Sequence, residues 1–99
     1  METELLELED GVVLKLKGRL DTKTSKDAAD VFTEVGEKYD HVTLDLQELS
    51  YISSAGIRAV RNLYMILFRK KGTLSVENPG ENVLSVFKMT GLSNLFNLK

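Results

Sequence analysis

Residues 44–58 read LDLQELSYISSAGIR, and this stretch passes from an apolar strand pattern through a polar segment to the start of a helix. Its first three residues alternate leucine, aspartate and leucine, a period of two that predicts a strand with one buried face. Residues 47–54 are mostly polar and predict a loop. From about residue 55 to residue 70, apolar side chains recur at helical spacing, which predicts an amphipathic helix. The loop therefore delivers Ser53 and Ser54 to the beginning of a helix.

Strand and helix patterns alternate on both sides of this stretch. We expect strands at residues 6–8, 12–20, 42–46 and 74–76, and helices at 55–70, 81–89 and from Thr24 or Ser25, whose hydroxyls could cap the first turn, to Tyr39. The dipeptide Asp10-Gly11 is typical of a tight hairpin turn. Each later strand is reached across a helix, which implies parallel crossovers. The predicted fold is α/β: a mixed β-sheet, with an N-terminal antiparallel hairpin plus parallel crossovers, covered by helices. We expect the apolar tail Leu92–Leu98 to pack as a last helical turn.

The composition limits what the chain can do. With 99 residues and 42% hydrophobic side chains, it has room for one domain, residues 1–99, with a single core. Its 13 basic and 15 acidic residues give a net charge of −2, which argues against nucleic-acid binding, because such proteins need a basic surplus. The lack of cysteine excludes disulfides and thiolate metal sites, and the single histidine, His41, excludes a two-histidine metal site. We expect no metal and no cofactor.

The first residues do not resemble a targeting signal. A secretory signal starts with basic residues followed by a long apolar run, whereas residues 2, 4, 7, 9 and 10 are all acidic. The longest apolar block, Leu63–Phe68, has six residues, and a membrane helix needs ~20. We therefore expect a cytoplasmic protein that begins at its own Met1 and does not insert into a membrane.

The two serines before the predicted helix are the leading candidates for chemistry. A serine at this position usually caps the helix, because its hydroxyl accepts a hydrogen bond from a free backbone N–H. The same helix end has a partial positive charge, so a phosphoserine would be stabilised there as well. Both roles can hold together, because a capping hydroxyl on an exposed loop is also open to a kinase.

Three other patterns are weaker. Asp45 and Glu48 could form a carboxylate pair for acid–base chemistry or a magnesium site, although a strand-end aspartate more often caps a loop. A hydrolase built on Ser54 would have His41 as its only possible base. A basic cluster on the second helix indicates a solvated face, an acidic partner surface or a contact with phospholipid headgroups; its members are Arg58, Arg61, Arg69, Lys70 and Lys71.

Several motifs together resemble the STAS domain, the fold of bacterial anti-sigma factor antagonists. The family pattern is a strand ending in Asp-Leu, a short loop, and Asp-Ser-Ser-Gly-Leu or a near variant opening a helix, and residues 44–58 are similar to it. Gly18-Arg19-Leu20-Asp21 resembles the family's turn after the second strand. Val86–Leu92 and the following Leu95-Phe96 resemble its last helix and tail. The resemblance covers nearly the whole chain, in the same order.

This resemblance implies a non-enzymatic regulator that switches partners. An anti-sigma factor antagonist would bind an anti-sigma factor of the GHKL serine kinase type and so release a sigma factor. Phosphorylation at the start of the second helix would break that complex, and a PP2C-type phosphatase would restore it. The alternative within the same fold is a STAS subunit of a lipid or anion transport assembly without a phosphorylation cycle. We expect a monomer or weak dimer.

The resemblance also assigns the site residues. In the family the phosphoacceptor immediately precedes the helix glycine, a position that Ala55 occupies in this chain. We therefore hypothesise that Ser54 is the acceptor, with Ser53 as the second choice. The expected partner-binding residues are Arg19, Asp21, Thr22, Ser53, Ser54, Ala55, Gly56, Ile57 and Arg58.

Overall fold

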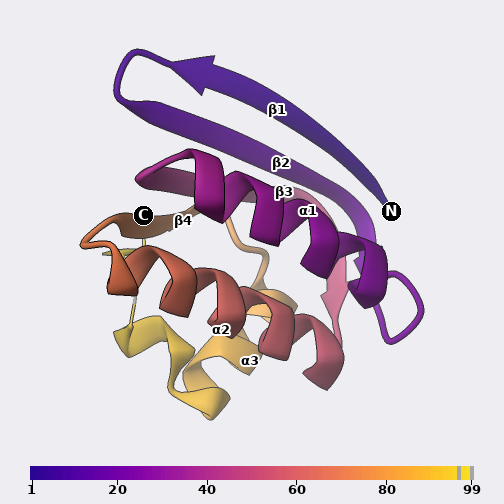
Figure 1. The fold of residues 1–99 in the computed structure, drawn as a ribbon. Coiled ribbons are helices and arrows are strands. Elements are labelled where there is room, and N and C mark those ends of the chain that lie inside the picture. The colour runs from indigo at the N-terminus through magenta and orange to yellow at the C-terminus, as the bar shows by residue number, and fades with distance from the viewer. Residues whose placement is uncertain (96, 99) are drawn as a thin grey trace.

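The sheet contains the antiparallel hairpin and the parallel crossovers that the sequence predicts, and one short strand more. The computed structural model describes residues 1–95 and 97–98, and within them the sheet contains five strands in the order β1-β2-β3-β4-β5. β1 and β2 run antiparallel, and β2, β3, β4 and β5 run parallel. The elements are β1 (Glu2–Leu8), β2 (Gly11–Leu20), α1 (Ser25–Lys38), β3 (His41–Ile52), α2 (Ser54–Arg69), β4 (Thr73–Glu77), α3 (Glu81–Thr90), the 3-10 turn η1 (Leu92–Asn94) and β5 (Asn97–Leu98) (Figure 1). An antiparallel hairpin followed by parallel crossovers confirms the predicted mixed α/β fold.

One face of the sheet is buried under helices. Side chains alternate along β2, so that Leu14 and Leu16 are buried while the residues between them are partly exposed. The helices α1 and α2 pack closely, because a Cβ on Gly36 of α1 would lie 3.0 Å from the side chains of Leu63 and Ile66 in α2. The largest fully buried side chains of this core are Phe32, Phe87, Leu14, Leu16, Leu20, Leu44, Leu46, Leu63, Leu67 and Leu92.

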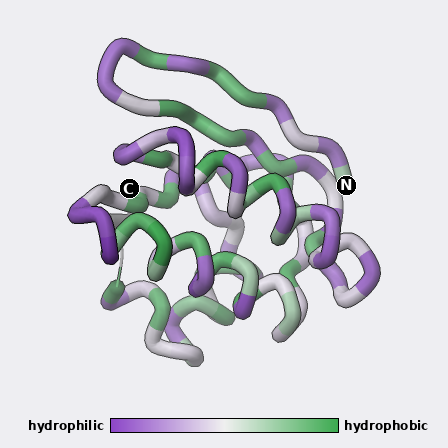
Figure 2. Tube along the Cα trace, viewed as in Figure 1, coloured by the Kyte–Doolittle hydropathy of each residue, from purple (hydrophilic) through white to green (hydrophobic). Residues whose placement is uncertain are grey.

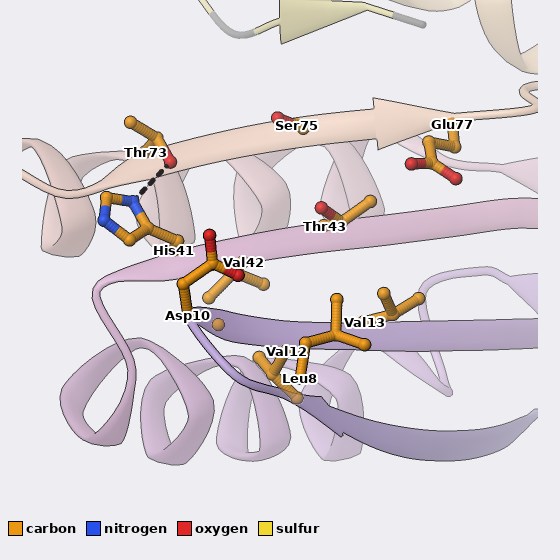
Figure 3. Close-up of a pocket in the computed structure, with 11 residues that line it drawn as sticks. Leu8, Asp10, Val12, Val13, His41, Val42, Thr43, Thr73, Ser75 and Glu77 are labelled. Atoms are coloured by element: carbon orange, nitrogen blue, oxygen red, sulfur yellow. Dashed lines mark hydrogen bonds between the residues drawn. The ribbon is translucent and has the colours of Figure 1, made fainter.

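Among the residues that the structure describes, no helix covers the other face of the sheet over β2 and β3 (Figure 3). Val13 and Thr43 are partly exposed there, whereas Ser75 on β4 is buried. Val13, Thr43 and Ser75 lie side by side in register across β2, β3 and β4. Figure 3 shows this open face toward the viewer, with helices behind the sheet. β1 is an edge strand, all seven of its residues are exposed, and apolar and polar segments alternate along it (Figure 2).

β3 is longer than the sequence predicts, and the expected loop at residues 47–54 is wrong. Residues 47–52 continue the strand and pair with the last part of β2. That pairing has register shifts on both sides of Lys17-Gly18. Such irregularities break the period of two by which a strand is recognised in a sequence, so this polar segment lacked a strand pattern.

The C-terminal tail matches the prediction in part. The expected last helical turn is η1, whose Leu92 is fully buried, at 0% exposure. The two-residue β5 follows and pairs with Ser75 and Val76 of β4. A strand this short has no periodic pattern of its own, and the sequence did not predict it. Phe96, part of the expected tail, lies outside the described residues.

Candidate functional site

A hydrogen bond joins the end of β2 to the start of α2. The backbone N–H of Ser53 donates to the carbonyl oxygen of Leu20, 2.9 Å away. One residue earlier on β2, the guanidinium of Arg19 lies over the ring of Tyr51, 4.3 Å from its centroid, which is a cation–π contact. The structure therefore brings together the two segments that the sequence assigned to partner binding.

Ser53 is the N-cap of α2. Its backbone is extended, and its hydroxyl oxygen accepts a hydrogen bond from the N–H of Gly56 at 3.2 Å. The residue is only 9% exposed. This bond satisfies one of the four free N–H groups at the helix start, and the predicted capping role of a serine before the helix is confirmed.

Ser54 is the first residue of α2 and is exposed. Its hydroxyl has no hydrogen-bond partner among the residues that the structure describes. The first turn of α2 contains no acidic residue, so no side chain of that turn offsets the partial positive charge of the helix end. Ala55, the next residue, is partly exposed. The two serines thus differ: Ser53 holds the helix start, whereas Ser54 is open to solvent.

The turn after β2 is held by reciprocal hydrogen bonds. The N–H of Asp21 donates to Thr24 Oγ1 at 3.0 Å, and the N–H of Thr24 donates to Asp21 Oδ1 at 2.9 Å. The bonds from the backbone and then the side chain of Thr24 lower the pKa of the Asp21 carboxyl below its ordinary value. Thr22, between them, is exposed.

The predicted capping of α1 by a hydroxyl is wrong. Thr24 occupies the N-cap position, but its oxygen makes no capping bond and instead accepts the N–H of Asp21 and donates to the carbonyl of Arg19 at 2.8 Å. The hydroxyl of Ser25 donates to the carbonyl of Asp21. The tight turn after β2 engages both hydroxyls, so neither is free to serve the helix.

A groove of about 310 Å³ lies between α1 and α2, beside the serine loop. Its lining is mostly apolar because three alanines contribute to it, and two exposed basic residues, Lys26 and Arg58, come from the two helices. The lining residues are Thr22, Ser25, Lys26, Ala29, Ala55, Arg58, Ala59 and Asn62. A shallow apolar hollow with basic side chains on each helix suits a partner with a small apolar contact and nearby carboxylates.

Of the groove residues, Thr22, Ala55 and Arg58 were expected from the family resemblance to bind the partner, and the other five were not. Ala29 and Ala59 carry no chemical group that would mark them in a sequence. One signal was present: Ala55, Ala59 and Asn62 are four and three residues apart, so they lie on one side of α2.

Gly56 and Ile57 support the site from inside. Both residues are buried. A Cβ on Gly56 would lie 2.8 Å from the side chains of Ile52 and Leu20 and 2.9 Å from the Leu20 carbonyl oxygen. Glycine therefore allows α2 to begin this close to the end of β2. These two expected partner-binding residues set the position of the loop and do not face solvent.

The structure keeps the residues of a hydrolase apart. His41 lies at the start of β3, where its Nδ1 is 2.8 Å from Thr73 Oγ1, whereas Ser54 follows the other end of that strand. The alternative of a hydrolase that uses Ser54 as nucleophile and His41 as base is therefore wrong. Figure 3 shows His41 and Thr73 beside a cavity of about 370 Å³ on the open face of the sheet.

Asp45 and Glu48 do not form a carboxylate pair. Asp45 Oδ1 accepts from the N–H of Gln47 at 3.1 Å and from Asn78 Nδ2 at 3.4 Å, whereas Glu48 lies 3.8 Å from Lys17 Nζ. Across residues 1–95 and 97–98, no group of three or more histidine, aspartate or glutamate side chains is placed to hold a metal ion. Over the same residues, none of the helices has the length and apolar character needed to cross a membrane.

Comparisons with known proteins agree on one family. The sequence profile of the STAS domain matches residues 3–99. The anti-sigma-B factor antagonist of Bacillus subtilis (strain 168) is 20% identical over 90 residues, which cover 91% of this chain and 83% of that protein. An anti-sigma factor antagonist from Mycobacterium paratuberculosis has a similar fold, with a TM-score of 0.87, 20% identity, and coverage of 98% of this chain and 83% of that one. The Bacillus cell fate determinant SpoIIAA in its phosphorylated form is also similar, with a TM-score of 0.78, 20% identity, and coverage of 99% and 91%.

Proposed function

Because this chain belongs to the STAS domain family, we propose that it is an anti-sigma factor antagonist, a non-enzymatic regulator that switches between partners. The observation that supports this proposal best is the difference between the two serines. Ser53 is buried and caps α2, whereas Ser54 offers an exposed hydroxyl beside the groove. Ser54 is the phosphoacceptor in this proposal, one residue before Ala55, which occupies the family's acceptor position.

The unmodified protein binds an anti-sigma factor of the GHKL serine kinase type through the groove and the exposed serine. A phosphate on Ser54 adds a charge of about −1.5 to −2 next to the groove, three of whose eight lining residues are alanines. Placing that charge in an interface fitted to a neutral hydroxyl costs desolvation. The helix start stabilises the same phosphate when the protein is free. Both effects favour dissociation, and a PP2C-type phosphatase reverses the switch.

Incubation with a purified GHKL-type kinase of the same genome and ATP, followed by intact mass measurement and peptide mapping, tests the acceptor. We expect one phosphate on Ser54 in the wild type and none in Ser54→Ala. Because Ser54→Ala retains the cap at Ser53, this control should fold normally. If the kinase is active on another substrate and leaves Ser54 unmodified, or modifies Ser53 instead, the assignment is wrong.

A binding experiment tests the switch itself. In a pull-down, the GHKL-type anti-sigma factor kinase used above should recover less of Ser54→Asp than of the wild type. The reason is that a fixed negative charge imitates part of the phosphate. Ala55→Glu places a charge at the neighbouring, family acceptor position and should also weaken the complex. Wild-type recovery of Ser54→Asp would remove the support for a charge-operated switch at this residue.

Ala55 favours a second candidate, a STAS subunit of a lipid or anion transport assembly without a phosphorylation cycle. At the family's acceptor position this chain has no hydroxyl to modify. In that case the wild type would copurify with permease subunits. The variant Ser54→Asp would copurify with them in the same amount.

A further inference from the structure

The exposed side of α2 forms one continuous face. Ser54, Arg58, Arg61, Met65 and Phe68 follow one another at spacings of four, three, four and three, so they lie along one side of the helix, and all five are exposed. We call this surface the α2 outer face, and its exposed residues are Ser54, Arg58, Arg61, Asn62, Met65, Phe68 and Arg69.

The α2 outer face is positively charged in a protein of net charge −2. α2 contains Arg58, Arg61 and Arg69 and no acidic residue over its 16 residues. In the part of the chain that the structure describes, none of these arginines has a carboxylate partner. By contrast Lys70, which follows the helix, is 3.3 Å from Asp40. The three guanidinium groups are therefore available to carboxylates of another molecule.

The C-terminal half of the same face adds two exposed apolar residues to the arginines. Met65 is 38% exposed and Phe68 is 61% exposed. The ring of Phe68 stacks on Tyr64 with centroids 5.7 Å apart. A hollow of about 150 Å³ beside it is lined in part by Tyr64, Leu67 and Leu95. Arginine, methionine and aromatic residues are the types enriched in protein interfaces, and exposed apolar side chains beside them mark a contact surface.

Resting on the proposed function, we infer that the α2 outer face docks an acidic, amphipathic helix of the anti-sigma factor. The unpaired arginines favour carboxylates opposite Arg58 and Arg61 by charge complementarity, and a second helix laid along α2 would bring side chains at the same spacing opposite these residues. Apolar side chains of the occupant cover Met65 and Phe68. A lipid surface fits less well, because a helix lying on a membrane presents a continuous apolar face, and the apolar stripe of α2 is already buried in the core.

The α2 outer face begins at Ser54, so docking and phosphorylation use the same surface. Ser54 and Arg58 are four residues apart and are neighbours on the helix. A phosphate on Ser54 pairs with Arg58 within the protein and repels the carboxylates of the docking helix. The switch thus acts by withdrawing one of the cations that the partner needs.

Isothermal titration calorimetry tests this inference. The full chain is titrated with each purified GHKL-type anti-sigma factor of the same genome. Arg61→Glu and Phe68→Ala change two exposed residues that lie outside the groove. Each should raise the dissociation constant about tenfold or more, the size of effect seen at interface hot spots. Matched controls on α3, Lys88→Glu and Met89→Ala, make the same changes at exposed positions and should bind within about twofold of the wild type. Circular dichroism checks that all four variants fold.

The outcomes separate the two proposals. If the wild type binds an anti-sigma factor and Arg61→Glu and Phe68→Ala bind it equally well, the docking surface is wrong and the proposed function stands. If no anti-sigma factor binds the wild type, the proposed function itself fails. A charge reversal in the partner should restore the binding of Arg61→Glu. In this partner variant, a glutamate of the acidic helix is replaced by arginine.

Two further measurements test the choice of occupant. Phosphatidylglycerol vesicles should not retain the wild type more than Arg61→Glu, and light scattering should give the same mass for both proteins at high concentration. Vesicle binding that Arg61→Glu abolishes would identify a lipid surface instead. Self-association that Arg61→Glu abolishes would identify a second copy instead.

Discussion

The backbone N–H of Ser53 donates to the carbonyl oxygen of Leu20 at 2.9 Å, and so the last residue of β2 holds the first turn of α2. Leu20 is fully buried, at 0% exposure, which makes it a rigid anchor. The serine loop is therefore fixed from its inner side, and its outer side is available to a partner.

Removing the cap should cost more stability than removing the exposed hydroxyl. Ser53→Ala leaves the N–H of Gly56 without its acceptor, and we expect the free energy of unfolding to fall by about 1 kcal/mol. Ser54→Ala removes no hydrogen bond and should stay within about 0.5 kcal/mol of the wild type. Urea denaturation measures both values. Equal losses in the two variants would contradict the division of roles.

Gly56→Ala should destabilise the protein and shift the serine loop. The new Cβ would meet the Leu20 carbonyl oxygen at 2.9 Å, and this backbone atom cannot rotate away. Overpacking costs about 1–3 kcal/mol, and the better helix propensity of alanine returns at most ~1 kcal/mol. Thermal unfolding should show a lower midpoint. Ser85→Ala is the control, because it places an alanine at an exposed position inside α3, and an equal loss in both variants would argue against the close approach at Gly56.

Ser54→Asp should stabilise the fold while it weakens partner binding. The carboxylate lies in the first turn of α2, which has no acidic residue, and a negative charge there contributes about 0.3–1 kcal/mol at low ionic strength. Pairing with Arg58 adds about 0.2–0.5 kcal/mol. Ser85→Asp places the same charge within α3, away from its first turn, and should give no such gain. A drop in the unfolding midpoint of Ser54→Asp would show that its weaker binding reflects damage to the fold.

Asp21 should make stability depend on pH in the acid range. Its pKa is lowered from the ordinary 3.8 by the hydrogen bonds from Thr24, so the folded state favours the carboxylate. The contribution is present above pH 3.8 and is lost as the pH falls through the lower folded value. Urea denaturation at a series of pH values measures this effect. The difference in free energy of unfolding between the wild type and Asp21→Asn should shrink as the pH falls below 3.8 and through the lower pKa of the folded state. Parallel curves for the two proteins would contradict the shift.

The element order could be predicted because each buried face leaves a regular pattern in the sequence. Alternation along β2 and the helical repeat of α2 reflect burial on one side, which sequence alone reveals. Residues 47–52 escaped prediction because irregular pairing with β2 interrupts the alternation, and β5 escaped because two residues have no period. The family resemblance at residues 44–58 rests on the order of the residues in the sequence. The two wrong predictions of secondary structure therefore did not affect it.

The candidate site could be predicted only where residue type carries information. Ser53 and Ser54 stand out in the sequence, but their division into a cap and an exposed hydroxyl depends on the rotation of α2 against β2. The groove was not predictable because Ala29 and Ala59 come from two helices whose crossing is set by packing. The α2 outer face was visible only as a basic cluster until the structure separated Lys70, which is paired, from the arginines.

The acidic edge strand has a consequence for how the molecule meets a partner. Glu2, Glu4 and Glu7 lie on β1, on the far side of α1 from α2 and its arginines (Figure 1). Glu4 and Glu7 each lie within 4.0 Å of a lysine, whereas the arginines of α2 have no carboxylate partner among the described residues. We therefore expect an electric dipole moment whose positive end is at α2. In the electric field of an acidic partner, this dipole produces a torque that turns α2 toward the partner before the surfaces touch. Association with an acidic partner surface should slow as salt is added, because salt screens this attraction.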